Sequence, residues 1–161
     1  IICPVRDVIE CIVSFLVLNK KNKNKKSFID ARLESKGLDL TDENRCEEIV
    51  NGDGGIKHDL FAMEHSKYKP DHYHFVEYND LVDNPSQIIS NLYNFLEIDY
   101  YEHNLKYINF TSQSRNSQYY GMPDLHKVRK KISKKSINPS DILPDSIIGK
   151  YSGMEFWRKN S

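Results

Sequence analysis

The sequence of 161 residues has no excess of charge of either sign, because 23 Lys and Arg residues balance 23 Asp and Glu residues. A bulk attraction to nucleic acid or to an anionic membrane is therefore not expected, and we expect neither partner. The three cysteines, Cys3, Cys11 and Cys46, are odd in number and form no C-x-x-C pair. This argues against a disulfide framework and against a structural zinc site. We expect no metal, and a reducing compartment, the cytoplasm.

Long hydrophobic runs are also missing. The most apolar stretch, residues 12–18, is far shorter than the roughly 20 residues that a membrane-spanning helix needs. The first residues lack the basic region, apolar run and small-residue cleavage site of a signal peptide. Disorder throughout is excluded, because 39% of the residues are hydrophobic and can form a core. The length predicts a single domain over residues 1–161.

The start of the chain has the pattern of a strand, a tight turn and a helix. Residues 1–5 are mostly apolar and predict a buried parallel strand, with Arg6 at its carboxyl end. Residues 7–18 carry apolar side chains at helical spacing, and Asp7 can cap that helix. Two strands with helical connections would make an α/β fold.

Further elements follow from local patterns. We expect helices at residues 28–35, in a segment capped by Thr41, and at residues 56–66. Residues 72–78 are rich in aromatic and β-branched side chains and predict a second strand. A helix should begin at Pro85 with Asn84 as its cap, and its buried stripe is expected at Ile88, Ile89, Leu92, Tyr93, Phe95 and Leu96.

The last third of the chain is less regular. Residues 109–120 predict an irregular surface loop, and residues 139–157 contain two short helical patterns, the second opened by Pro144. Residues 126–135 are basic and fit an amphipathic helix with Leu125, Val128 and Ile132 on its apolar side. Its charged side could contact nucleic acid, but a solvated face is the simpler interpretation.

Arg6 and Ser14 carry the first indication of chemistry. An Arg at the end of a parallel strand points into the crevice where open α/β sheets bind ligands, and Ser14 lies about two helical turns further along. Together they could hold one phosphate, since Arg supplies a planar fork of donors and Ser a hydroxyl. Alternatively, Arg6 pairs with Asp7 or Glu10, and Ser14 is only a small residue at a helix contact.

With these residues the sequence resembles the sulfotransferase family, whose enzymes use 3′-phosphoadenosine 5′-phosphosulfate. The resemblance rests on the Arg6 to Ser14 spacing, on residues 74–85 and on a helix ending at residues 93–96. Residues 120–129 look like the C-terminal segment of bacterial-type members, and residues 156–157 like their ending. The resemblance implies a three-layer α/β fold with a P-loop-like parallel sheet and flanking helices.

The resemblance also assigns donor-binding residues. Arg6 and Ser14 match the pair that grips the 3′-phosphate of the donor, and Tyr78 matches the tyrosine near the adenine. Lys127 and Arg129 fall where the family brings further basic groups to the same phosphate. Val8 replaces the usual Pro two places after the Arg. For Tyr78 the alternative is an aromatic side chain that packs on the core at the end of a strand.

The implied reaction moves a sulfuryl group from the donor to a hydroxyl or amine of an unidentified small-molecule or glycan acceptor. The family's 5′-phosphosulfate loop and its catalytic His or Glu would both lie before Ile1, so we expect the C-terminal portion of a complete domain and name no catalytic residue. The rivals are an ATP-dependent kinase-like enzyme on the same fold and a non-catalytic module that binds nucleotide or nucleic acid.

Histidines give one more candidate site. His72 and His74 are two residues apart and could offer two metal ligands from one strand face, but no third ligand is evident at a suitable spacing. His58 and His65, seven residues apart on one helical face, are equally weak evidence. A structural or surface role is the simpler interpretation of both pairs.

Overall fold

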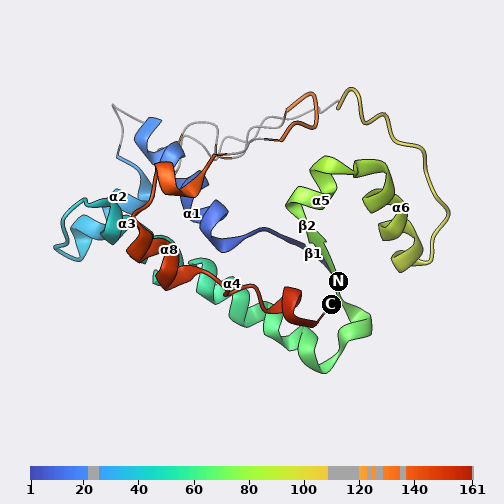
Figure 1. The fold of residues 1–161 in the computed structure, drawn as a ribbon, viewed down its shortest axis with the longest axis horizontal. Helices are drawn as coiled ribbons and strands as arrows, with labels where there is room; N and C mark the ends of the chain where they lie inside the picture. The colour runs from blue at the N-terminus through green and yellow to red at the C-terminus, as the bar shows by residue number, and fades with distance from the viewer. Residues whose placement is uncertain (22–25, 109–119, 123–124, 126–128, 135–136, 161) are drawn as a thin grey trace. The chain divides into compact units, whose positions relative to one another are not determined.

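The computed structural model describes residues 1–21, 26–108, 120–122, 125, 129–134 and 137–160 (Figure 1). The chain divides into two compact units. The first unit comprises residues 1–6, 63–112 and 128–136, and the second comprises residues 7–62, 113–127 and 137–161. We describe each unit by itself, and the single domain expected for residues 1–161 stays a prediction.

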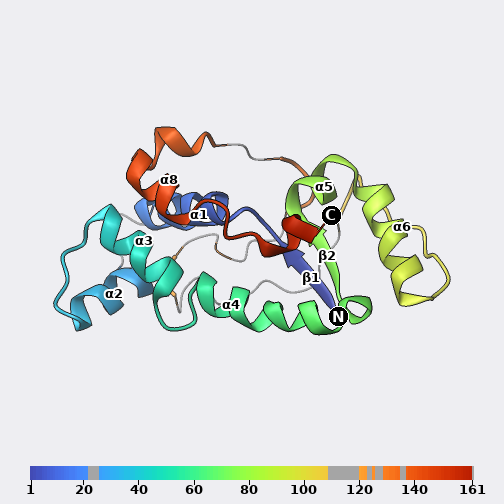
Figure 2. The same cartoon turned by 60° about the horizontal axis from the view of Figure 1, so that its bottom comes forward.

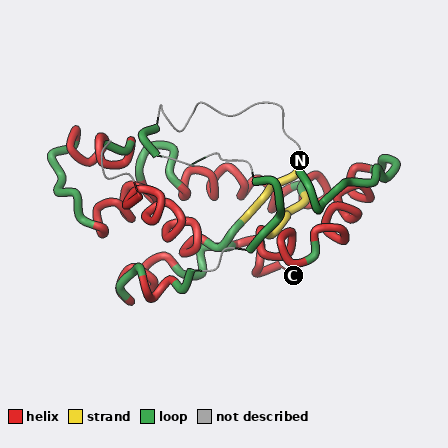
Figure 3. The backbone as a smooth tube through the Cα atoms, turned by 90° about the horizontal axis from the view of Figure 1, so that it is seen from above, coloured by secondary structure: helices red, strands yellow, loops and turns green. Residues whose placement is uncertain are grey.

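The first unit is built around a small parallel sheet. Strand β1 (Ile2–Val5) pairs with strand β2 (His74–Glu77), and the register places Cys3 opposite Phe75 and Val5 opposite Glu77 (Figure 3). Both predicted strands are confirmed, and both are shorter than predicted. Because the pairing is parallel, the carboxyl ends of the two strands lie at the same edge of the sheet.

Along the chain, helices come before and after the second strand of the first unit. Two 3₁₀ helices, η1 (Glu64–Tyr68) and η2 (Pro70–His72), lead into β2, and helices α5 (Tyr78–Asp83) and α6 (Pro85–Leu96) follow it. The ring of His74 on β2 stacks on that of Phe95 on α6, with 4.9 Å between the centroids. This contact attaches α6 to the sheet.

Three predictions for this region need correction. The second strand does not reach Tyr78, because Tyr78 begins α5, where Asp80 in the first turn suits the helix dipole. Helix α6 has the predicted bounds, but the side chain of Asn84 makes no capping hydrogen bond. No residue of α6 is fully buried, so its apolar stripe is only partly covered by the described residues.

The second unit is a helical assembly with a continuous apolar core. It contains α1 (Val8–Lys21), α2 (Phe28–Ser35), α3 (Asp42–Asn51) and most of α4 (Ile56–Met63). Helix α3 packs against both α1 and α2 (Figure 2). The fully buried side chains of the second unit come from all three of these helices and include Ile12, Leu16, Ile29, Leu33, Cys46 and Val50.

Local caps explain where these helices begin. The Ser27 hydroxyl accepts a hydrogen bond from the backbone N–H of Asp30, and the Thr41 hydroxyl accepts one from that of Asn44. The predicted helix at residues 28–35 and the Thr41 cap are therefore confirmed. The helix predicted for residues 56–66 is shorter than expected, because it changes to the 3₁₀ helix η1 at Glu64.

The C-terminal residues complete the second unit. They form η3 (Pro139–Asp141), α8 (Asp145–Tyr151) and η4 (Phe156–Asn160), and α8 packs against α1. The two predicted helical patterns are thus present, with Pro144 at the N-cap of the second. In α8, Lys150 and Tyr151 donate hydrogen bonds of 2.6 and 2.5 Å to the carboxylate of Glu47 on α3.

A short internal segment also packs on the second unit. Its Tyr120 carbonyl accepts a hydrogen bond of 3.0 Å from the backbone N–H of Phe28, and the side chain of Met122 is completely buried. Between them, Gly121 has a φ of +63° and lies so close to the Lys26 carbonyl that a Cβ would collide with it. The predicted loop at residues 109–120 lies outside the described residues except for Tyr120.

The basic helix predicted for residues 126–135 is wrong in the part that the structure describes. Residues 129–134 have no helical backbone. The backbone N–H of Ile108 instead donates to the Lys130 carbonyl at 2.9 Å, and Lys134 pairs with Asp83 at 2.6 Å. Helical periodicity in the sequence was therefore outweighed by tertiary contacts. Among the described residues, no helix is both long and apolar enough to span a membrane.

Candidate functional site

Arg6 and Tyr78 meet at the carboxyl edge of the sheet. Arg6 directly follows β1 in sequence, and Tyr78 directly follows β2, so the parallel pairing brings them to one edge. The guanidinium carbon of Arg6 lies 4.3 Å from the centroid of the Tyr78 ring. Both residues are half-buried. The predicted Arg6 and Tyr78 are thus brought together in a cation–π contact.

The stacking orients the guanidinium. A guanidinium makes its hydrogen bonds in its own plane, whereas an aromatic ring contacts its face. The Tyr78 ring therefore restricts the orientation of Arg6 through the face of its guanidinium. At a strand end, such an Arg is suited to bind an oxyanion.

Asp7 is one of the two acidic neighbours considered for Arg6, and its carboxylate has partners of its own, while the pairing of Arg6 with Asp7 or Glu10 stays an alternative. One oxygen of Asp7 accepts a hydrogen bond of 3.2 Å from the backbone N–H of Glu10, as the predicted cap of α1 requires. The other oxygen lies 3.1 Å from the guanidinium of Arg158. The Asp7 carboxylate is therefore engaged by the helix and by the C-terminal tail.

Ser14 lies on α1 in the second unit. The buried side of α1 is formed by Val8, Ile9, Ile12, Val13, Leu16 and Asn19. At 100° per residue, Ser14 falls opposite this stripe, and it is half-buried. Its hydroxyl is thus carried on the side of α1 that faces away from the helix's buried stripe.

The sequence analysis missed the residue that closes the start of α1. A carboxylate oxygen of Glu155 accepts a hydrogen bond of 2.8 Å from the backbone N–H of Val8, and Glu155 is only 6% exposed. A carboxylate is stabilised there by the unpaired amides and by the dipole of the helix. No local pattern could have found this contact, because the two residues are 147 positions apart.

The structure says less about Lys127 and Arg129, the two remaining candidates for donor binding. Lys127 lies outside the described residues. Arg129 is exposed and belongs to the first unit, the unit that contains Arg6 and Tyr78. The pair between Lys134 and Asp83 connects this basic segment to the last residue of α5, the helix that Tyr78 begins.

The environment of two thiols and the grouping of possible metal ligands can be described for part of the chain. Burial raises the pKa of the Cys3 thiol, and burial followed by the nearby carboxylates of Asp42 and Glu43 raises that of Cys46 to about 12. Both thiols are therefore protonated near neutral pH. Across the described ranges, no three His, Cys, Asp or Glu side chains come together as metal ligands.

Comparison with known proteins places the chain in a family. A search of the curated proteins and a search of the solved structures gave no match. The family model described as "Sulfotransferase domain" matches residues 1–139. The matched range includes Arg6, Ser14, Tyr78 and Arg129, together with both strands. Since it covers more than half of the sequence, the chain belongs to the sulfotransferase domain family.

Proposed function

We propose that this protein transfers a sulfuryl group from 3′-phosphoadenosine 5′-phosphosulfate to a hydroxyl or amine of a small-molecule or glycan acceptor. Sulfuryl transfer in general follows from the family match. The choice of donor rests on one observation, the guanidinium of Arg6 stacked on Tyr78 at the edge where two parallel strands end.

The residues assigned to the donor have the chemistry that its 3′-phosphate requires. Arg6 would supply charge-assisted hydrogen bonds, and Ser14 would add a hydroxyl donor from a helix. Tyr78 would hold Arg6 in place and present an aromatic ring to the adenine. Lys127 and Arg129 would add positive charge to the same phosphate.

The 3′-phosphate does not react, so these residues would act through position. Binding energy gained at a remote group can be used to place the reacting group correctly. Transfer of the sulfuryl group would be in line between the leaving and attacking oxygens, by analogy with phosphoryl transfer. We assign the catalytic base to none of the described residues.

We also propose that the two strands belong to a three-layer, P-loop-like α/β fold. The parallel pairing of β1 and β2 supports this, and so does the helical connection between them, which runs through α1 to α4. Parallel strands need such crossovers, which are usually helical. Residues 1–161 would then be part of one sulfotransferase-like domain.

Calorimetric titration with adenosine 3′,5′-bisphosphate and with ATP tests the donor assignment. The bisphosphate should bind more tightly, because Arg6 recognises the 3′-phosphate that ATP lacks. Arg6→Ala should weaken bisphosphate binding about tenfold or more, since a hydrogen bond to a charged group contributes about 1.5–3 kcal/mol. Tyr78→Phe, which keeps the ring, should be milder than Tyr78→Leu.

The matched control is Lys21→Ala, which removes an exposed positive charge at the last residue of α1. It should leave the affinity for the bisphosphate nearly unchanged. Equal affinity for ATP and the bisphosphate, or tighter binding of ATP, would instead favour the kinase-like enzyme. Unchanged affinity in Arg6→Ala would remove this residue from the site.

A further inference from the structure

The first turn of α1 is held by two side chains that come much later in the sequence. A carboxylate oxygen of Glu155 accepts a hydrogen bond of 2.8 Å from the backbone N–H of Val8. The guanidinium of Arg158 lies 3.1 Å from a carboxylate oxygen of Asp7. All four residues belong to the second unit. We refer to Glu155 and Arg158 as the α1 clamp.

The two contacts of the α1 clamp differ in burial. Glu155 is 6% exposed and Val8 is 1% exposed, so water competes little for the hydrogen bond between them. A buried N–H that loses its acceptor costs free energy, because it cannot turn to water instead. The side chains of Arg158 and Asp7 are 40% and 30% exposed, and such an ion pair contributes less. Glu155 is therefore the main residue of the clamp.

The helix does not need Glu155 for its local cap. Asp7 precedes α1, and its carboxylate already accepts a hydrogen bond of 3.2 Å from the backbone N–H of Glu10. Glu155 binds a different amide, that of Val8, the first residue of the helix. The clamp is thus an addition to a capped helix, and it acts at the point nearest to β1.

The clamp holds one side of the link that carries Arg6. Only Arg6 and Asp7 connect the end of β1 to the start of α1. Before the link, Val5 is 5% exposed and is paired in the parallel sheet. After it, the clamp fixes Asp7 and Val8. Because a link of two residues has few backbone conformations once both of its ends are fixed, the clamp also restricts the backbone of Arg6.

We propose that Glu155, aided by Arg158, is a positioning residue for Arg6, which it holds ready for the donor nucleotide. This rests on the proposed function, since Arg6 would bind the 3′-phosphate. Glu155 would touch no substrate and would act through the backbone of the link. A group that is ordered before binding does not have to be ordered by the ligand, so affinity rises. Without the clamp, only a fraction of the molecules would present Arg6 correctly, and the affinity would fall by that fraction.

Calorimetric titration with adenosine 3′,5′-bisphosphate tests the proposal, at a temperature where circular dichroism shows each variant to be folded. Glu155→Ala removes the acceptor and should weaken binding about fivefold, the equivalent of one helix cap. Glu155→Gln keeps an acceptor oxygen but loses the charge that the helix dipole favours, so the loss should be only about twofold. This second variant carries the test if the alanine variant does not fold.

A double-mutant cycle distinguishes positioning from a general structural role. If Glu155 acts through Arg6, adding Glu155→Ala to Arg6→Ala should weaken binding no further. The matched control is Glu47→Ala, which removes another carboxylate of the second unit that is hydrogen-bonded by Lys150 and Tyr151. It should leave the affinity for the bisphosphate almost unchanged.

The outcomes also separate this proposal from the proposed function. If the unsubstituted protein binds ATP as tightly as the bisphosphate, the donor assignment fails and the positioning role fails with it. If the bisphosphate is preferred and Arg6→Ala weakens its binding, the donor assignment holds. The positioning role alone is then overturned if both Glu155 variants bind like the unsubstituted protein, or if Glu155→Ala causes the same loss with and without Arg6.

Discussion

The two units of this protein bury their apolar side chains to very different extents. Among the described residues, the first unit has Cys3, Val5 and Val76 as its buried hydrophobic side chains. The second unit buries residues from α1, α2, α3, α4 and α8. The first unit also exposes many large apolar side chains, namely Ile1, Ile2, Tyr68, Leu96, Ile98, Tyr100, Tyr101 and Tyr107.

This difference concerns where the stability of the protein comes from. Burial of apolar area is the main favourable contribution to folding, so the second unit should provide most of the free energy of unfolding. The first unit contains Arg6 and Tyr78, whereas Ser14 belongs to the second. Residues that bind ligands are often carried on the less stable parts of a protein.

The largest expected effect comes from truncating a leucine in each unit. Leu33 on α2 is 1% exposed, whereas Leu96 at the end of α6 is 44% exposed. Leu33→Ala should lower the free energy of unfolding by about 2–5 kcal/mol, since it leaves a cavity. Leu96→Ala should change it by no more than about 0.5 kcal/mol. Urea denaturation followed by circular dichroism measures both.

Equal losses in these two leucine variants would show that α6 is buried more fully in solution than the described residues indicate. A small loss in Leu33→Ala would show that the second unit is not the stable part. Either result would break the comparison between the units.

A smaller effect should appear in the reactivity of two buried thiols. Cys3 belongs to the first unit and Cys46 to the second. In a Cys11→Ser background, Cys3 should react with a disulfide reagent about tenfold faster than Cys46, because a unit with few buried apolar contacts opens more easily. Burial raises the pKa of both thiols, that of Cys46 to about 12, so each should react mainly after its surroundings open.

Labelling in concentrated urea provides the control for this experiment, since both thiols are then accessible and should react at similar rates. If Cys46 reacts as fast as Cys3 in the native protein, the second unit opens as readily as the first.

The smallest expected effect is a pH-dependent contact inside the second unit. Hydrogen bonds from Lys150 and then Tyr151 hold the pKa of Glu47 below its ordinary value of 4.5. A lowered pKa in the folded state means that this contribution is present above pH 4.5 and is lost as the pH falls through the folded pKa. Because the pair is half exposed and screened by solvent, its contribution to the free energy of unfolding should be small.

The test compares Glu47→Gln with the unsubstituted protein from pH 7 to pH 3. The variant should be slightly less stable at pH 7, and the difference should shrink as the pH falls and Glu47 of the folded protein takes up a proton. Glu43→Gln, on the same helix, is the control. A difference between Glu47→Gln and the unsubstituted protein that is the same at pH 7 and pH 3 would contradict the assignment to this carboxylate.

Local signals in the sequence were sufficient for most helices and both strands. Helix α2 has the predicted bounds, and the cap at Thr41 forms, because such caps involve residues only three positions apart. The contact between Arg6 and Tyr78 could also have been predicted, since each residue was placed at the end of a predicted parallel strand. The family resemblance named both residues as donor-binding, but it paired Arg6 with Ser14 and assigned Tyr78 to the adenine.

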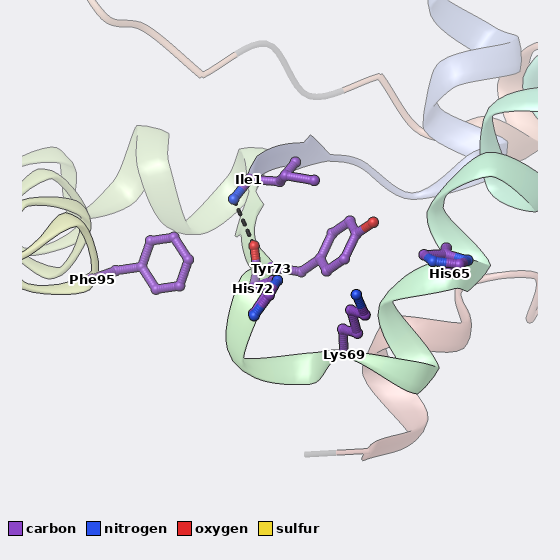
Figure 4. A pocket seen from close by; sticks show the side chains of 6 residues that line it. All are labelled: Ile1, His65, Lys69, His72, Tyr73 and Phe95. Carbon is purple, nitrogen blue, oxygen red and sulfur yellow. Dashed lines mark hydrogen bonds between the residues drawn. The ribbon is translucent and has the colours of Figure 1, made fainter.

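Features that depend on tertiary contacts could not be predicted from the sequence. Helix α5 has six residues, too few for an apolar period to be recognised. The segment at residues 129–134 had a helical period, yet its contacts with Ile108 and Asp83 hold it in another conformation. A cleft near the amino ends of the strands is lined by residues from three separate segments, and no single stretch of sequence indicates it (Figure 4).

The hydrogen bond between Glu155 and Val8 has a consequence for synthesis of the protein on the ribosome. The first turn of α1 is synthesised 147 residues before the carboxylate that completes it. Until then the amide of Val8 is left to water. The start of this helix is therefore completed only when a distant, later part of the chain has been made.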